Sequence, residues 1–181
     1  MMCFPRTSEF LPDFRWLLSA VACLMLFGCG YHFSRTSTAG LFPPDVKTIV
    51  LESAVNNTTV TGIEKELTNG IRREFALAQG LSPVRSGGDV ALKTLIASYE
   101  DTPSMYKADG KELTRIGTLS LRCSLEKSDS NKLMWKKDLA ASYPYTVTDT
   151  ISETLTNRRA AISQMIKDLV PRIRSALYDD F

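Results

Sequence analysis

The sequence predicts an α+β fold, a two-layer sandwich in which two helices pack on one face of a four-stranded sheet. Residues 46–181 contain four segments with strand patterns and two with helical periodicity, in the order strand, helix, three strands, helix. Of the 181 residues, 44% are hydrophobic and 23% are charged, which is typical of one folded domain of ordinary size. We therefore expect residues 46–181 to form a single domain.

The first predicted strand covers residues 46–51, which are rich in β-branched side chains and follow the Pro43-Pro44 break. Residues 55–61 are polar and predict a turn. Thr61 and Glu64 have the spacing of a capping box, in which each side chain bonds to a free backbone N–H of the first helical turn. A helix is expected to begin there.

The first helix is predicted by apolar residues that recur every four positions and by the charged residues between them. We expect Gly80 to end it in a left-handed conformation. Gly70 in its middle costs about 1 kcal/mol relative to alanine, so we expect a compensating close approach of the helix backbone to a strand. The recurring apolar residues are Ile63, Leu67, Ile71 and Phe75.

Three strands are predicted next, over residues 90–100, 114–126 and 133–145. The middle one alternates strictly between apolar and polar residues, which is typical of a sheet with one buried face. Cys123 falls on the apolar side, so core packing is its expected role. The apolar positions are Leu119, Leu121, Cys123 and Leu125 in the middle strand, and Leu133, Trp135, Leu139, Ala141, Tyr143 and Tyr145 in the last.

The second helix is expected to start at a capping box formed by Thr150 and Glu153. Pro171 lies inside it, removes one backbone hydrogen bond and crowds a carbonyl, so we expect a kink or break near Val170 and helix again over residues 173–177. Its apolar face is expected to comprise Leu155, Ile162, Ile166, Leu169, Ile173 and Leu177.

The sheet face away from the helices is predicted to be only partly polar. Because an exposed face of mixed character often meets a partner, we favour contact with protein or lipid over simple solvation. The residues assigned to this face are Ile116, Thr118, Ser120, Arg122, Met134, Lys136, Ala140 and Ser142.

The N-terminus predicts export and lipidation. The apolar run over residues 16–27 matches a signal-peptide core and is shorter than the roughly 20 residues that span a bilayer. It leads into Leu26-Phe27-Gly28-Cys29, which resembles a bacterial lipobox, so residues 1–28 are expected to be cleaved and Cys29 to carry the lipid. An ordinary secretory signal is the alternative, and translation starts at either Met1 or Met2. Residues 29–45 would form a tether, and a residue other than Asp at position 30 implies the periplasmic face of the outer membrane.

Composition argues against several classes of function. A net charge of +2 lacks the basic excess of nucleic-acid-binding proteins. One histidine, His32, and four scattered cysteines leave no spacing for a metal site or a His-assisted nucleophile. We expect no enzyme activity, no metal and no cofactor.

The opening Cys29-Gly30-Tyr31-His32-Phe33 and the later Val170-Pro171-Arg172-Ile173-Arg174 resemble the lipopolysaccharide-assembly lipoprotein family, LptE, also called rare lipoprotein B. The resemblance implies a two-helix, four-strand sandwich that sits as a plug inside the outer-membrane β-barrel LptD. It further implies that the protein helps to assemble that barrel and to pass lipopolysaccharide to the outer leaflet.

By the same resemblance, lipopolysaccharide contacts are expected at the tip over residues 104–111, between the second and third strands. A flexible cation beside an aromatic ring suits a sugar phosphate and its carbon skeleton. A second basic residue expected in residues 146–150 is missing, and the alternative role of the tip cations is solubility. The other functional hypothesis is a free-standing lipoprotein that binds a lipid or small ligand. The candidate contacts are Tyr106, Lys107, Lys111 and Arg115.

Overall fold

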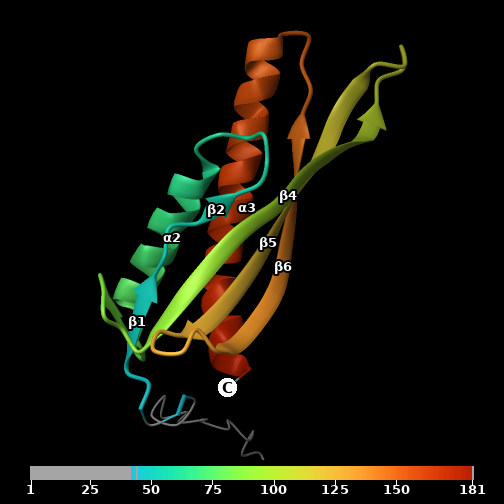
Figure 1. The fold of residues 1–181 in the computed structure, drawn as a ribbon. Helices are drawn as coiled ribbons and strands as arrows, with labels where there is room; N and C mark the ends of the chain where they lie inside the picture. Colours follow the sequence, from blue (N-terminus) through green and yellow to red (C-terminus); the bar gives the residue numbers. More distant parts are fainter. Residues whose placement is uncertain (1–41, 44, 181) are drawn as a thin grey trace, which may run out of the picture. The chain divides into compact units, whose positions relative to one another are not determined.

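The structure is a computed structural model that describes residues 42, 43 and 45–180. The predicted signal peptide and Cys29 lie outside these residues. The predicted order of four strands and two helices is confirmed, but two further short strands make the sheet six-stranded instead of four-stranded. In chain order the elements are β1 (Thr48–Leu51), β2 (Val55–Asn56), α2 (Ile63–Leu77), β3 (Ser82–Val84), β4 (Val90–Tyr106), β5 (Glu112–Lys127), β6 (Leu133–Thr146) and α3 (Ile151–Asp179) (Figure 1).

The sheet is mixed, with the strand order β3-β1-β4-β5-β6 and with β2 also paired to β4. β1 runs parallel to β3 and β4, and β2 runs parallel to β4. The long strands β4, β5 and β6 form an antiparallel meander. The two added strands have only two and three residues, too few to show a period-two pattern, and β2 lies in the segment predicted as a turn.

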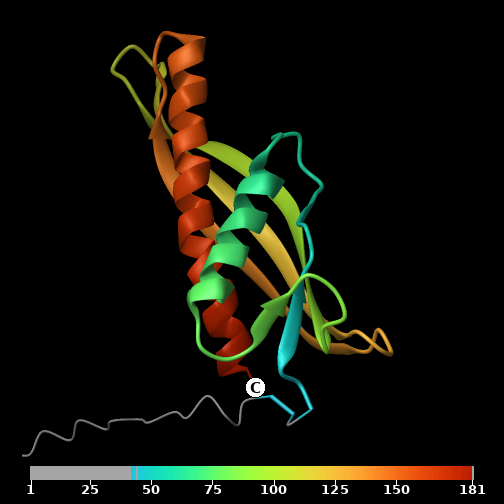
Figure 2. The same cartoon turned by 90° about the vertical axis from the view of Figure 1, so that its left-hand side faces the viewer.

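Both helices lie on one face of the sheet, as predicted (Figure 2). The apolar stripe of α2 is buried at Ile63, Leu67, Ile71 and Phe75. The alternation of β5 is confirmed as well, because its four apolar positions are at most 1% exposed. These two faces meet the buried side chains of α3 in one core, which contains Ile162, Met165, Ile166, Leu169, Ile173 and Leu177.

Three predicted core positions are wrong. Leu155 is 53% exposed because the first turns of α3 extend beyond the core, whose α3 residues begin at Ala161. In β6, Trp135, Ala141 and Tyr145 are buried, but Leu133 and Tyr143 are exposed. Leu133 lies past a register shift between Leu125 and Glu126, at the end of the strand.

Neither predicted capping box forms. α2 is preceded by Gly62, whose φ of +85° brings the chain into the helix in a left-handed conformation without a side-chain cap. Glu64 instead accepts a hydrogen bond from Asn56 Nδ2 at 3.0 Å and so fixes the loop that contains β2. Thr150 makes no side-chain cap for α3 either. The Thr154 hydroxyl instead accepts the Thr148 N–H at 3.0 Å and so ties the segment before the helix to its first turn.

Two predictions about helix interiors and ends need correction. α2 ends at Leu77 with Ala78 in an extended conformation, so Gly80 lies beyond the helix. There it leaves room for the Tyr178 hydroxyl, which a Cβ at position 80 would approach to 2.3 Å. α3 continues through Pro171 without a break, because the residues on both sides of the proline pack in the core and Arg172 bridges back to Asp168 at 2.7 Å.

Gly70 makes the predicted close approach, but its neighbour is a helix and not a strand. A Cβ at this position would lie 2.9 Å from Val170 Cγ2 on α3. Since glycine exposes backbone where a side chain would keep the helices apart, Gly70 sets the distance between α2 and α3 at their contact.

Cys123 is fully buried and unpaired, as expected for a core residue. Burial raises the pKa of its thiol to about 12, so the group is a neutral thiol in the folded protein. Among the described helices, none combines the length and the apolar character needed to span a bilayer.

Candidate functional site

The predicted tip is the turn between β4 and β5. The Lys107 N–H donates to the Lys111 carbonyl at 2.7 Å, and the Gly110 N–H donates to the Lys107 carbonyl at 2.9 Å. Gly110 has a φ of +81°, which the turn requires and which a residue with a Cβ adopts only with strain. The turn is therefore closed by its own backbone, and it holds three of the four predicted contact residues within a few positions of one another.

The tip is exposed and carries apolar side chains beside its cations. Tyr106 is 60% exposed and Met105 is 52% exposed. Lys107 Nζ lies 3.6 Å from an Asp149 carboxylate, and Lys111 Nζ lies 3.8 Å from Asp109. Exposed ion pairs at such distances contribute between about 0 and 1 kcal/mol, so an external anion can replace these carboxylates at little cost.

Arg115, the fourth predicted contact, lies farther along β5 and already has partners. Its guanidinium is 2.8 Å from Asp101 and 2.8 Å from Glu112, and it also donates to the Asp101 carbonyl at 3.1 Å. Burial opposes its charge, but the two carboxylates outweigh that effect and raise the pKa of Arg115. The structure thus separates Arg115 from the three tip residues by its environment.

The carboxylate of Asp101 joins Arg115 to α3. Its other oxygen lies 3.4 Å from Arg158 Nε, and the Arg158 guanidinium stacks over the Tyr99 ring at 4.7 Å. Burial and the Asp101 charge raise the pKa of the neighbouring Tyr145 to about 12. This network ties the base of the hairpin to the second helix.

Gly117 makes room for that network. A Cβ at this position would lie 2.7 Å from the Tyr99 hydroxyl, so only glycine lets the ring lie across β5. The sequence could not reveal this contact, since the pairing of Asp101 with Gly117 depends on the register of β4 against β5.

Sequence reasoning missed a second exposed apolar element at the same end of the domain. Ile151, in the first turn of α3, is 80% exposed, and it lines a hollow of about 770 Å³ along the helix together with Leu155 and Arg159. The Lys107–Asp149 pair connects the tip to the loop that leads into this helix. The spacing of four between Ile151 and Leu155 was a signal for a shared helical face, but it could not show that the face is open.

The sheet face opposite the helices carries small polar side chains and paired charges. Register places Ser120 opposite Ala140 and Thr118 opposite Ser142, with the two hydroxyls 2.9 Å apart. Arg122 on this face pairs with Asp138 at 3.0 Å. Within the described part of the chain, both helices pack on the other face, so this face is open.

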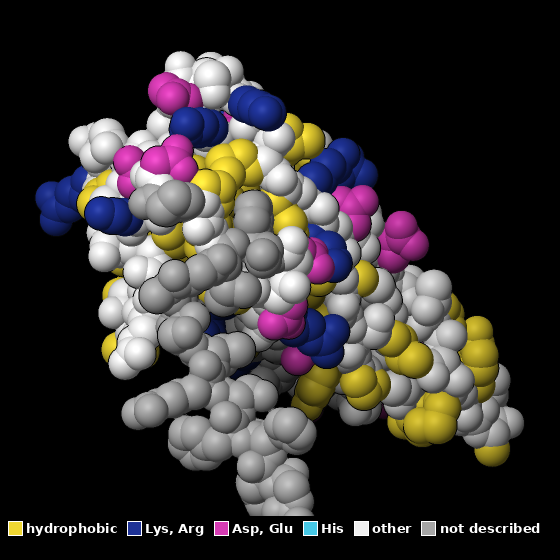
Figure 3. Space-filling view, turned by 90° about the horizontal axis from the view of Figure 1, so that it is seen from below, with side chains coloured by type: hydrophobic (Ala, Val, Ile, Leu, Met, Phe, Trp, Pro, Cys, Tyr) yellow, Lys and Arg dark blue, Asp and Glu magenta, His cyan; other side chains and the backbone are white. Residues whose placement is uncertain are grey.

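Charge elsewhere on the domain is dispersed. In the view of Figure 3, the Lys and Arg side chains of the described residues are scattered among Asp and Glu and do not gather in one basic patch. Among the residues that the structure describes, no three His, Cys, Asp or Glu side chains are placed to hold a metal ion.

Comparison with known proteins identifies the family. The chain resembles rare lipoprotein B from Shewanella oneidensis, with a TM-score of 0.55 and 14% identity over 72% of this chain and 95% of that one. A putative lipoprotein from Caulobacter crescentus gives a TM-score of 0.50 and 12% identity over 70% and 89% of the two chains. A protein from Xanthomonas campestris gives a TM-score of 0.52 and 14% identity over 74% of this chain and 85% of that one.

These likenesses show a shared fold. No curated protein sequence matches the chain. The family model LptE, described as lipopolysaccharide-assembly, matches residues 46–177, which cover the whole sheet, α2 and all but the last two residues of α3. The chain therefore belongs to the LptE lipopolysaccharide-assembly family.

Proposed function

We propose that this protein is an outer-membrane lipoprotein, anchored through Cys29, that plugs and helps to assemble the LptD β-barrel and assists the delivery of lipopolysaccharide to the outer leaflet. Family membership supports the assembly role. The observation that carries the ligand contact is the β4–β5 tip, where an exposed aromatic ring adjoins two cations that only weak surface pairs engage.

The tip has the chemistry that an anionic glycolipid needs. Lys107 and Lys111 supply mobile ammonium groups for a sugar phosphate, and Tyr106 supplies a flat apolar surface for sugar or acyl carbon. Arg115 acts as a positioning residue, because its contacts with Asp101 and Glu112 hold the base of the hairpin. The tip lies at the end of the sheet away from the start of β1, and hence away from the chain end that leads to the proposed anchor (Figure 1).

A lipid at Cys29 would keep this domain on the membrane surface. Each buried CH₂ contributes about 0.8 kcal/mol, so several acyl chains hold a protein far more firmly than one. Mass spectrometry of the mature protein tests this part of the proposal, and an unmodified N-terminal residue would contradict it.

The open sheet face is the surface that we assign to the barrel wall. Its small side chains, among them Ser120, Ala140 and Ser142, allow close contact, and its charges at Arg122 and Asp138 are already paired with each other. Purification of the full chain from detergent-solubilised envelopes tests the assignment. Recovery together with a large β-barrel protein supports the plug, whereas recovery alone favours a free-standing lipoprotein that binds a lipid or small ligand.

Lys107→Asp tests the ligand contact. We expect lipopolysaccharide binding to weaken about tenfold, because the substitution replaces an attraction to phosphate by a repulsion. The matched control is Lys132→Asp, which makes the same charge change in the exposed turn between β5 and β6. Both variants should melt within a few degrees of the wild type. Equal affinity of Lys107→Asp and the control would return Lys107 to the role of a solubilising residue.

A further inference from the structure

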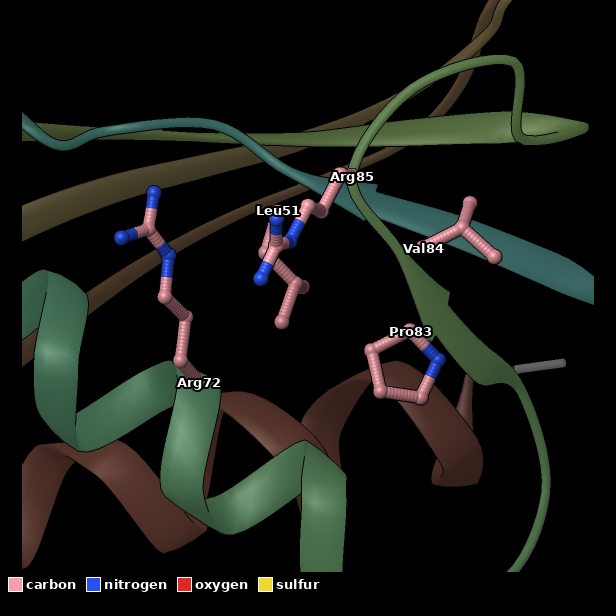
Figure 4. A pocket seen from close by; sticks show the side chains of 5 residues that line it. All are labelled: Leu51, Arg72, Pro83, Val84 and Arg85. Atoms are coloured by element: carbon pink, nitrogen blue, oxygen red, sulfur yellow. The ribbon is translucent and has the colours of Figure 1, made fainter.

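A second cationic site lies on the helix layer, between α2, β1 and β3. A cavity of about 480 Å³ is lined by Arg72 of α2, by Arg85 just after β3, and by three apolar residues. Figure 4 shows the two arginine side chains extending from different elements into the same space. Leu51, Pro83 and Val84 form the apolar part of its lining.

Among the residues that the structure describes, neither of these arginines has a carboxylate partner. Within residues 42–180 the structure gives no ion pair or side-chain hydrogen bond to Arg72 or Arg85. Arg115, Arg122 and Arg174, by contrast, each contact a carboxylate at 3.0 Å or less, and Arg73, which is also without an ion pair among the described residues, does not line this cavity. Both arginines are exposed and positively charged, so an anion that binds between them is attracted to both and offsets their mutual repulsion.

We propose that Arg72 and Arg85 form a site for a phosphate group, separate from the β4–β5 tip. Guanidinium groups offer paired N–H donors that match the oxygens of a phosphate, and two of them from different elements can grip it from two sides. None of its residues belongs to the tip or to the open sheet face, so the site itself is separate from those surfaces, whereas the choice of its ligand rests on the lipid anchor of the proposed function.

The apolar lining indicates which phosphate the site takes. Free phosphate is hydrated on all sides and gains nothing from Leu51, Pro83 or Val84, whereas the headgroup phosphate of an anionic phospholipid carries carbon that can cover them. The site adjoins β1, the first strand after the predicted tether, so a membrane-anchored chain would hold it near a lipid surface. The phospholipid headgroup is the source that we infer.

The test measures binding to the full chain in non-ionic detergent by titration calorimetry, with two probes. One is inorganic phosphate, and the other is mixed micelles that contain phosphatidylglycerol. The variant carries Arg72→Gln and Arg85→Gln. The control carries Arg73→Gln and Lys132→Gln, which remove the same charge at two exposed residues that have no ion pair within the described residues.

We expect the Arg72/Arg85 variant to bind phosphatidylglycerol micelles at least tenfold more weakly than the control, with an unchanged melting temperature. If inorganic phosphate binds with the same dependence on these two arginines and the lipid binds no tighter, the site stands but its ligand is a free anion. Equal binding of variant and control, or no binding of either probe to the wild type, would overturn the proposal. The response of the Lys107→Asp variant to lipopolysaccharide is independent of all these outcomes.

Discussion

Replacing Gly70 by alanine tests the contact between α2 and α3. The added methyl group would lie 2.9 Å from Val170 Cγ2, well inside the roughly 3.5–4.0 Å at which carbon atoms attract each other. Val170 cannot turn away easily, because a β-branched side chain in a helix has one strongly preferred rotamer. The helices must therefore move apart, or the packing around Val170 must change.

Two opposing effects set the magnitude. Overpacking of a core costs about 1–3 kcal/mol, and exchanging glycine for alanine inside a helix returns about 1 kcal/mol. We expect Gly70→Ala to lower the free energy of unfolding by about 0–2 kcal/mol. Adding Val170→Ala removes the clash, so the two substitutions should be coupled and the double variant should be more stable than the sum of the single effects predicts.

Urea unfolding of the four proteins in this cycle provides the measurement, followed by Trp135 fluorescence and by helical circular dichroism. Trp135 is buried in the sheet and reports on the core that both helices cover. A Gly70→Ala variant that is about 1 kcal/mol more stable than the wild type, with additive effects in the double variant, would refute the contact. That result would mean that helix propensity alone decides the effect.

Two further predictions follow from individual ionisable groups. Asp89 accepts hydrogen bonds at 2.8–2.9 Å from the Lys47 N–H, the Thr48 N–H and the Thr48 hydroxyl, and these bonds lower its pKa in the folded protein. The stability that Asp89 contributes is therefore present above its pKa in the unfolded chain and is lost as the pH falls through its pKa in the folded protein. Asp89→Asn should therefore flatten the acid side of the stability profile, measured as melting temperature against pH, and an unchanged acid slope would contradict this. Burial raises the pKa of Cys123 to about 12, so a thiol reagent at pH 8 should label it only as fast as the protein unfolds, and rapid labelling of the native protein would show that the thiol is accessible.

Long periodic elements were predictable because their pattern is local. The alternation in β5 repeats over several residue pairs and the apolar stripe of α2 repeats over several turns, and the apolar side chains of both are buried as expected. The short strands β2 and β3 were not predictable, since they exist only through pairing with β4 and β1, which come from other parts of the chain. Sequence spacing also suggested capping boxes at Thr61 and Thr150, but Gly62 and not Thr61 precedes α2, and Thr150 makes no side-chain cap.

The candidate site divides in the same way. Tyr106 and Lys107 could be placed at a tip because a polar turn separates two strand patterns. The carboxylates around Arg115 could not be foreseen, since Asp101 reaches it across a register that only the folded sheet sets. Arg72 belongs to the predicted helix α2, but Arg85 directly follows β3, a strand that the sequence did not reveal, so their convergence appears only in three dimensions.

The distribution of paired charges explains how the tip can be exposed and yet fixed. Beyond Ile96 the strand β4 pairs only with β5 in the described chain, and β5 pairs with β6 only as far as Thr114, so the residues nearest the turn form a two-stranded ribbon. A two-stranded ribbon of this kind is only marginally stable in water by itself. Asp101 compensates by binding Arg115 within the hairpin and Arg158 on α3. The charged groups below the tip therefore pair with one another, while Lys107 and Lys111 have only surface pairs at 3.6 Å and 3.8 Å. A ligand that binds these two lysines meets a turn that is held in place by contacts the ligand does not need to break.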